Sequence, residues 1–90
     1  MLNMTPAQCR AARALIEWTQ PELAAASKLG MSTIVDFEKS RRSVSLDVIS
    51  AIRRALEAGG VIFVDENGEG PGVRLKKNRT SEGTPPEELG

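Results

Sequence analysis

The sequence predicts a small, mainly α-helical domain that ends in a short C-terminal β-hairpin or β-arm. Two observations predict the helices. Residues 19–37 contain a helix-start signal, then a break in the helical pattern, then apolar residues that resume helical spacing. Residues 46–58 contain apolar residues at helical spacing throughout. A third observation predicts the strands. After Gly59 and Gly60 the helical spacing of apolar residues ends, and the β-branched and aromatic run VIFV follows. Ninety residues suit one modest core.

The first helix is expected to begin after Thr5, with Pro6 in its first position, and to continue to about Glu17. Trp18 follows at the junction with the next helix. Since the chain has only three aromatic residues, Trp18 is interpreted as core and not as a base-stacking platform. Cys9 lies among alanines and is interpreted as a small packing residue, with a reactive thiol as the alternative.

The second helix is predicted to begin at a capping box. Thr19 can accept from a backbone N–H while Glu22, three residues later, reaches back to Thr19. The small side chain of Ala24 allows another helix to approach closely. The helical pattern breaks at 28–30 and resumes with Ile34 and Phe37, so a third helix is expected from about 31 to 39.

The segment from Arg10 to Arg54 contains a characteristic set of residues at defined spacing: Arg13, Gln20, Glu22, Leu23, Ala24, Ile34, Phe37 and Glu38. With this set the segment resembles the phage-repressor and Cro-like helix-turn-helix domains of the XRE family. Lys28 departs from the family pattern, which has Gly in the turn, and Gly30 stands where the family has a Ser or Thr cap. A register with Gly30 as the turn and Ser32 as the cap is rejected, since it breaks the spacing from Ala24 to Ile34. The resemblance implies a four-to-five-helix repressor-like domain.

A fourth helix is predicted at 46–58, where Ser45 is the cap and the glycines at 59 and 60 end the helix. Its apolar residues recur with helical spacing and are expected to close the core over the first and third helices. These residues are Val48, Ile49, Ile52 and Leu56.

After the fourth helix, VIFV at 61–64, the turn-rich DENGEGPG and VRLKK from Val73 predict a hairpin. A lone hairpin is marginal in water, so something must cover it. The family usually adds a fifth helix here and often dimerises through this region. The interpretation preferred here is that the strand pairs with another subunit, although pairing within one chain stays open. The expected dimerisation residues are Val61, Ile62, Phe63 and Val64.

The predicted organisation is therefore a helix-turn-helix DNA-binding domain at 1–60, a β-arm for dimerisation at 61–77 and a disordered tail at 78–90. The tail NRTSEGTPPEELG has no apolar periodicity and contains two adjacent prolines. No apolar run is long enough to cross a membrane, and the N-terminus does not resemble a signal peptide, so a cytoplasmic location is expected. One cysteine and no histidine leave no parts for a zinc site. No cofactor is expected, and no grouping of nucleophile and base indicates an enzyme.

The net charge is zero, but the charges are unevenly distributed. Residues 1–64 contain eight Lys and Arg against six Asp and Glu, and residues 65–90 contain four against six. Lys39, Arg41 and Arg42 form a basic cluster directly after the predicted third helix, where a DNA backbone is expected to pass. A solvated surface is the alternative for such a run, and the position behind that helix favours phosphate contacts.

The resemblance implies a sequence-specific transcriptional regulator that binds double-stranded DNA as a homodimer and acts as a repressor. In the family the third helix lies in the major groove, and two such helices read half-sites about 34 Å apart. Gln20 matches a family position that anchors a phosphate, while Arg13 and Glu38 match a structural pair. The base-reading positions implied are Met31, Ser32, Thr33, Val35 and Asp36.

Two alternatives stay open at this stage. Asp36 can accept from a cytosine amino group, or it can be a solvated helix residue. Small members of the family also serve as antitoxins, which bind a toxin protein and repress their own operon. The strand pair and the acidic tail could then form a partner-binding arm.

Overall fold

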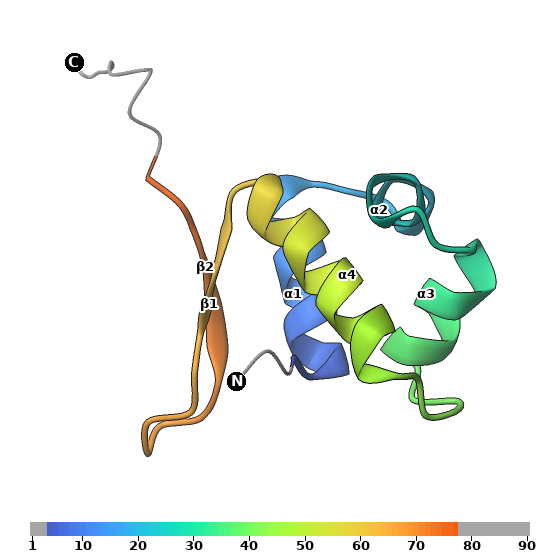
Figure 1. Ribbon diagram of the computed structural model, residues 1–90. Helices are drawn as coiled ribbons and strands as arrows, with labels where there is room; N and C mark the ends of the chain where they lie inside the picture. The colour runs from blue at the N-terminus through green and yellow to red at the C-terminus, as the bar shows by residue number, and fades with distance from the viewer. Residues whose placement is uncertain (1–3, 78–90) are drawn as a thin grey trace.

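The structure is a computed structural model, and it describes residues 4–77. In chain order this region contains α1 (Pro6–Ile16), α2 (Gln20–Ser27), α3 (Met31–Glu38), α4 (Leu46–Ala58), β1 (Val61–Val64) and β2 (Gly72–Leu75) (Figure 1). The mainly α fold with a C-terminal hairpin is confirmed. The tail predicted at 78–90 lies outside the described residues.

Three of the four helices begin at a side-chain cap. Thr19 and Glu22 form the predicted capping box: the Glu22 N–H donates to Thr19 Oγ1 at 3.2 Å, and the Thr19 N–H donates to Glu22 Oε1 at 2.7 Å. Thr5 and Gln8 form a second capping box at the start of α1, with distances of 2.9 and 3.0 Å. Ser45 caps α4, as predicted. The cap of α3 is Gly30, which has no side chain to contribute.

The turn between α2 and α3 follows the register preferred from the sequence. Lys28 ends α2 in the left-handed conformation, with φ of 61°, and the Leu29 N–H donates to the Ala24 carbonyl at 3.0 Å. A non-glycine residue in this conformation costs about 1 kcal/mol or more. Gly30 is extended, with φ of −71°, and α3 follows at once. The rejected register, with Gly30 as the turn, is not adopted.

The core lies between the helices and the inner face of the hairpin. Leu23, Ile34, Ile52 and Leu56 are fully buried, and each comes from α2, α3 or α4. The expectation that 46–58 closes the core over the first and third helices holds for α1 but needs correction for α3. The main helical neighbour of α4 is α2 and not α3, because α2 buries Leu23 and the small Ala24 and so allows close approach.

The hairpin is covered within the chain. Strand β1 pairs with β2 in antiparallel register, with Val61 opposite Leu75 and Phe63 opposite Val73. Val61 and Phe63 belong to the core, and their strand packs against α1 and α4. The Gln8 side chain also donates to the Gly72 carbonyl at 3.0 Å, which fixes β2 on α1. The strands pair with each other, so another subunit is not needed to cover this hairpin.

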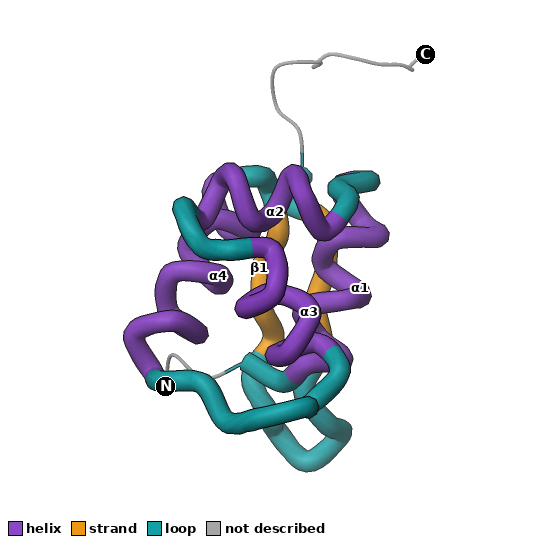
Figure 2. Tube along the Cα trace, turned by 90° about the vertical axis from the view of Figure 1, so that its right-hand side faces the viewer, coloured by secondary structure: helices purple, strands orange, loops and turns teal. Residues whose placement is uncertain are grey.

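Helix α3 and the hairpin lie on opposite sides of the layer formed by α1 and α4. Figure 1 shows α3 at one end of the molecule and the strands at the other, and Figure 2 shows α3 in front of the strands. The exposed face of α3 is therefore free of the hairpin.

Candidate nucleic-acid interface

The first turn of α3 presents side chains to solvent. Met31 is 42% exposed and Ser32 is also exposed, while Thr33 and Val35 are half-buried. Ile34, Phe37 and Glu38 are the buried residues of this helix. The helix therefore has one face in the core and one face directed outward, as a reading helix requires.

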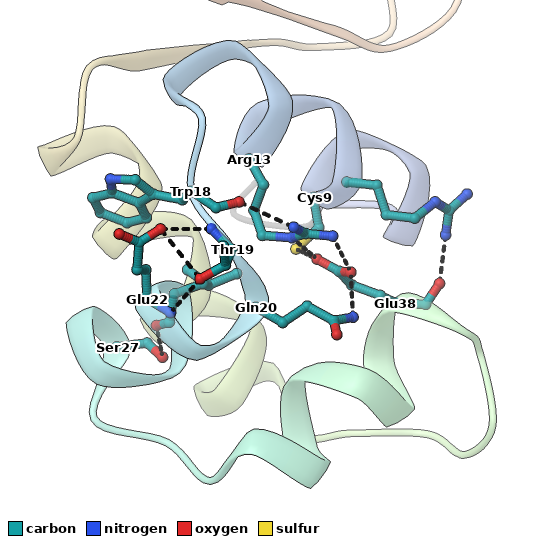
Figure 3. Close-up of polar contacts among 10 residues, drawn as sticks. Cys9, Arg13, Trp18, Thr19, Gln20, Glu22, Ser27 and Glu38 are labelled. Carbon is teal, nitrogen blue, oxygen red and sulfur yellow. Dashed lines mark hydrogen bonds and ion pairs between the residues drawn. The ribbon is translucent and has the colours of Figure 1, made fainter.

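Glu38, at the end of α3, is the centre of a buried polar network that joins three helices (Figure 3). Arg13 of α1 donates through Nε to Glu38 Oε2 at 2.7 Å and through Nη2 to Oε1 at 2.8 Å. Gln20 of α2 donates through Nε2 to Oε1 at 3.0 Å, and the Cys9 thiol donates to Oε2 at 3.1 Å. Both carboxylate oxygens thus have two donors each.

The network changes the ionisation of its members. Burial raises the pKa of Glu38, but the hydrogen bonds from Arg13, Cys9 and Gln20 outweigh burial, and the pKa lies below its ordinary value. The hydrogen bonds to Glu38 raise the pKa of Arg13. Burial raises the pKa of the Cys9 thiol, and the hydrogen bond to Glu38 raises it further. Glu38 is therefore held ionised, Arg13 is held charged and Cys9 is held as a thiol.

Two members of this region were not predicted as contacts from the sequence. Cys9 was interpreted as a packing residue, and it is fully buried, but its thiol also bonds to Glu38. Arg10 donates through Nη1 to the Glu38 backbone carbonyl at the end of α3. The available signal was helical spacing: Cys9 and Arg13 are four residues apart on α1 and face the same partner.

Gln20, which the resemblance assigns to a phosphate, has an internal partner. It is half-buried at the start of α2, and its amide nitrogen donates to Glu38. One amide hydrogen is used in this bond, and the second stays available to an external acceptor. Trp18, two residues before Gln20 in the chain, packs against the core, and its carbonyl accepts from Arg13 Nη1 at 3.0 Å.

The basic cluster lies in the loop directly after α3. Lys39, Arg41 and Arg42 are exposed, and Arg42 donates through Nε to Asp36 Oδ2 at 2.8 Å. The ion pair brings together one residue expected to contact a phosphate and one expected to read a base. The side chains of Lys39 and Arg41 form no hydrogen bond or ion pair with another residue of 4–77.

The four residues expected to form a dimer differ in position. The side chains of Val61 and Phe63 are buried under the helices, with exposed fractions of 3% and 8%. Ile62 is 38% exposed on the opposite face of β1, and Val64 is half-buried. The Arg53 guanidinium stacks on Phe63 from the helical side, 4.8 Å from the ring centroid. Only Ile62 and Val64 therefore offer side-chain surface to a partner.

A comparison with protein families agrees with the arrangement of α2, the turn and α3 described above. Residues 10–59 match the family described as Helix-turn-helix, which covers more than half of the chain. The chain belongs to this family. It is an XRE-type helix-turn-helix protein, and such proteins are DNA-binding regulators of transcription. A search of curated proteins found no match.

Among residues 4–77, no helix is both long and apolar enough to cross a membrane. Over the same residues, no three His, Cys, Asp or Glu side chains gather in a way that could hold a metal ion.

Proposed function

We propose that this helix-turn-helix protein is a sequence-specific repressor that binds its operator as a homodimer, with α3 in the major groove. The observation that carries the proposal is the outward face of α3, whose first turn is exposed and whose last residue, Glu38, is fixed by bonds from both α1 and α2. A rigid helix with a free face can present side chains to base edges in one orientation.

Direct reading is assigned to the outward positions of α3. Ser32 and Thr33 can donate to or accept from bases, and Met31 or Val35 can contact a thymine methyl group. Asp36 belongs to the same outward face, and its carboxylate is partly occupied by Arg42.

Phosphate contacts are assigned to Lys39 and Arg41, whose exposed side chains follow α3, and to the second amide hydrogen of Gln20. Contacts of this kind fix the protein on the duplex without reading its sequence. They also make binding depend on salt, because each neutralised phosphate releases counterions.

Dimerisation is assigned to the hairpin, at Ile62 and Val64 on the outer face of β1. Val61 and Phe63 support that strand from inside the core. A symmetric dimer binds an inverted repeat whose half-sites are one helical turn, about 34 Å, or a multiple of a turn apart.

The deciding experiment is selection of duplexes by the full chain from a random-sequence pool, followed by binding titration at fixed salt. The proposal expects one recurrent inverted repeat, bound about a thousandfold or more tighter than unselected DNA. Repression is tested by placing the selected sequence over a promoter and measuring transcription with and without the protein. A pool without a recurrent sequence contradicts the proposal.

An antitoxin role is the second candidate, and a cavity favours it. A space of about 640 Å³ opens between the start of α1, the start of α4 and the hairpin turn. It is lined by apolar residues such as Met4, Leu46 and Ile49 and by the acidic residues Asp65 and Glu66. None of the positions assigned to DNA lines it, so a protein could dock there while α3 binds an operator. Purification of the untagged chain with a stoichiometric second protein supports this role.

A further inference from the structure

The strongest unexplained feature is the ion pair between Asp36 and Arg42. Arg42 Nε donates to Asp36 Oδ2 at 2.8 Å. Asp36 lies one helical turn after Ser32, so the pair belongs to the outward face of α3. The Arg42 side chain is 58% exposed and that of Asp36 is 21% exposed. The Arg42 guanidinium therefore extends from the loop after α3 and lies against the proposed reading face.

The pair leaves the outer edge of the guanidinium unused. Within residues 4–77, Nη1 and Nη2 of Arg42 form no hydrogen bond, since only Nε is engaged. Arg13 is different, because its Nε, Nη1 and Nη2 all have acceptors. When the Nε–H is bound to the carboxylate, the end-on edge of the guanidinium, with one N–H from each of Nη1 and Nη2, points away from the carboxylate as a fork of parallel donors.

Stability does not account for this arrangement, because an exposed ion pair contributes only about 0–1 kcal/mol. Pre-organisation of the Arg42 side chain for binding explains the ion pair. An arginine side chain loses considerable rotamer freedom when it binds, and an arginine already held in place loses less. Arg41, its neighbour in the chain, has no such support and suits a phosphate contact. The supported arginine suits a contact that demands defined geometry.

We propose that Arg42 reads a guanine in the major groove, with Nη1 and Nη2 donating to O6 and N7, and that Asp36 is the positioning residue that holds Nε. Guanine presents two acceptors side by side on its groove edge, which matches the free fork. This inference rests on the proposed function. It moves Arg42 from phosphate contact to base reading and gives Asp36 a role through Arg42.

The test uses the full chain and the inverted repeat selected by the wild-type protein. Arg42→Ala is expected to abolish the preference for guanine at one position of each half-site and to leave the rest of the motif unchanged. Affinity for the guanine-containing site should fall about 5- to 150-fold per contact, the range for a bidentate pair. Replacing that guanine by 7-deazaguanine removes N7. It should weaken the wild type and leave Arg42→Ala nearly unaffected.

Asp36→Ala and Asp36→Asn separate positioning from a structural role. Asp36→Ala should reduce discrimination at the same position by a smaller factor, and Asp36→Asn, which keeps an acceptor oxygen, should restore part of it. Arg41→Ala is the matched control, and it should weaken binding to all sequences alike. Thermal melting of each variant should stay near that of the wild type, because the pair is exposed.

The outcomes distinguish the two proposals. If the wild type selects no motif, the proposed function fails and the reading role of Arg42 fails with it. If a motif is found, but Arg42→Ala weakens every sequence equally and lowers the salt dependence, only this inference fails and Arg42 contacts a phosphate. Guanine discrimination that survives Arg42→Ala overturns it in the same way.

Discussion

Arg13 and Glu38 form a two-point ion pair between the first and third helices, Nε to Oε2 at 2.7 Å and Nη2 to Oε1 at 2.8 Å. The carboxylate is 1% exposed, whereas 19% of the Arg13 side chain stays accessible. A planar guanidinium bound at two points fixes both distance and direction. The pair therefore sets the angle at which α3 presents its outward face.

Glu38→Ala is expected to destabilise the fold strongly, because Arg13, Gln20 and Cys9 lose a common acceptor. Breaking a buried pair costs roughly 3–5 kcal/mol, and the lower end applies here since Arg13 is partly exposed. The melting temperature should fall by about 4–8 °C per kcal/mol. Glu69→Ala is the control, because this exposed turn glutamate forms no side-chain hydrogen bond or ion pair with another residue of 4–77 and should leave the melting temperature nearly unchanged. Unchanged melting of Glu38→Ala with lost operator binding would move Glu38 to the reading surface.

Acid should destabilise the protein partly through Glu38. Its pKa in the folded state is below the ordinary value of 4.5, so the unfolded state binds more protons in the range below that value. The stabilisation is fully present above about pH 4.5 and is lost as the pH falls through the folded pKa. One proton corresponds to at most about 1.4 kcal/mol per pH unit. Urea unfolding from pH 7 to 3 should show a shallower acid limb for Glu38→Gln than for the wild type. Glu69→Gln, at an exposed turn position, removes one carboxylate outside this network and serves as the control.

Base reading is tested at the first turn of α3. Ser32→Ala combined with Thr33→Ala should cost about 1–3 kcal/mol at the selected operator and leave binding to random DNA nearly unchanged. Fluorescence anisotropy with both duplexes at one salt concentration measures the difference. An equal loss on the two duplexes assigns these hydroxyls to the DNA backbone.

Phosphate contact is tested at Arg41, whose exposed side chain has no partner among residues 4–77. Arg41→Gln should weaken binding to all sequences and reduce the slope of log affinity against log salt by roughly one. Arg54→Gln is a suitable control, since Arg54 is an exposed arginine on α4, outside the proposed interface. If the slope is unchanged for Arg41→Gln, its side chain faces solvent in the complex.

The local features of the fold could be predicted from the sequence, because each depends on residues a few positions apart. The Thr19 and Glu22 box and the Ser45 cap belong to this group, whereas the turn position of Lys28 came from the resemblance. The hairpin was predicted too, but not what covers it. The cover comes from packing of Val61 and Phe63 under the helices and from the Gln8 bond to the Gly72 carbonyl, which joins residues 64 apart in the chain.

The candidate site likewise contains contacts that could be predicted from the sequence and contacts that could not. The resemblance supplied the pairing of Arg13 with Glu38, whereas the bonds from Gln20 and Cys9 to that carboxylate appear only once three helices meet. The pair between Asp36 and Arg42 also escaped prediction. Its six-residue separation crosses the end of a helix, where the loop conformation decides which side chains meet. Ser40, with φ of 55°, turns the chain at that point.

The last prediction concerns the dimer. Since Val61 and Phe63 are core residues, truncation after Gly60 removes part of the core, and its failure to dimerise would reveal little about the interface. Ile62 allows a cleaner test, because it lies on the outer face of β1 and is 38% exposed. Leu15 of α1 has the same exposed fraction and provides a matched control.

Ile62→Lys should yield a folded monomer, because a charge at the centre of an apolar contact is left without a partner. Leu15→Lys should stay dimeric. Sedimentation velocity at several concentrations gives the masses, and circular dichroism confirms that both variants keep their helices. The monomer should lose operator affinity by orders of magnitude, since one subunit contacts only a single half-site. The opposite result, a monomer with Leu15→Lys and a dimer with Ile62→Lys, moves the interface to α1 and leaves the hairpin as a cover for the core.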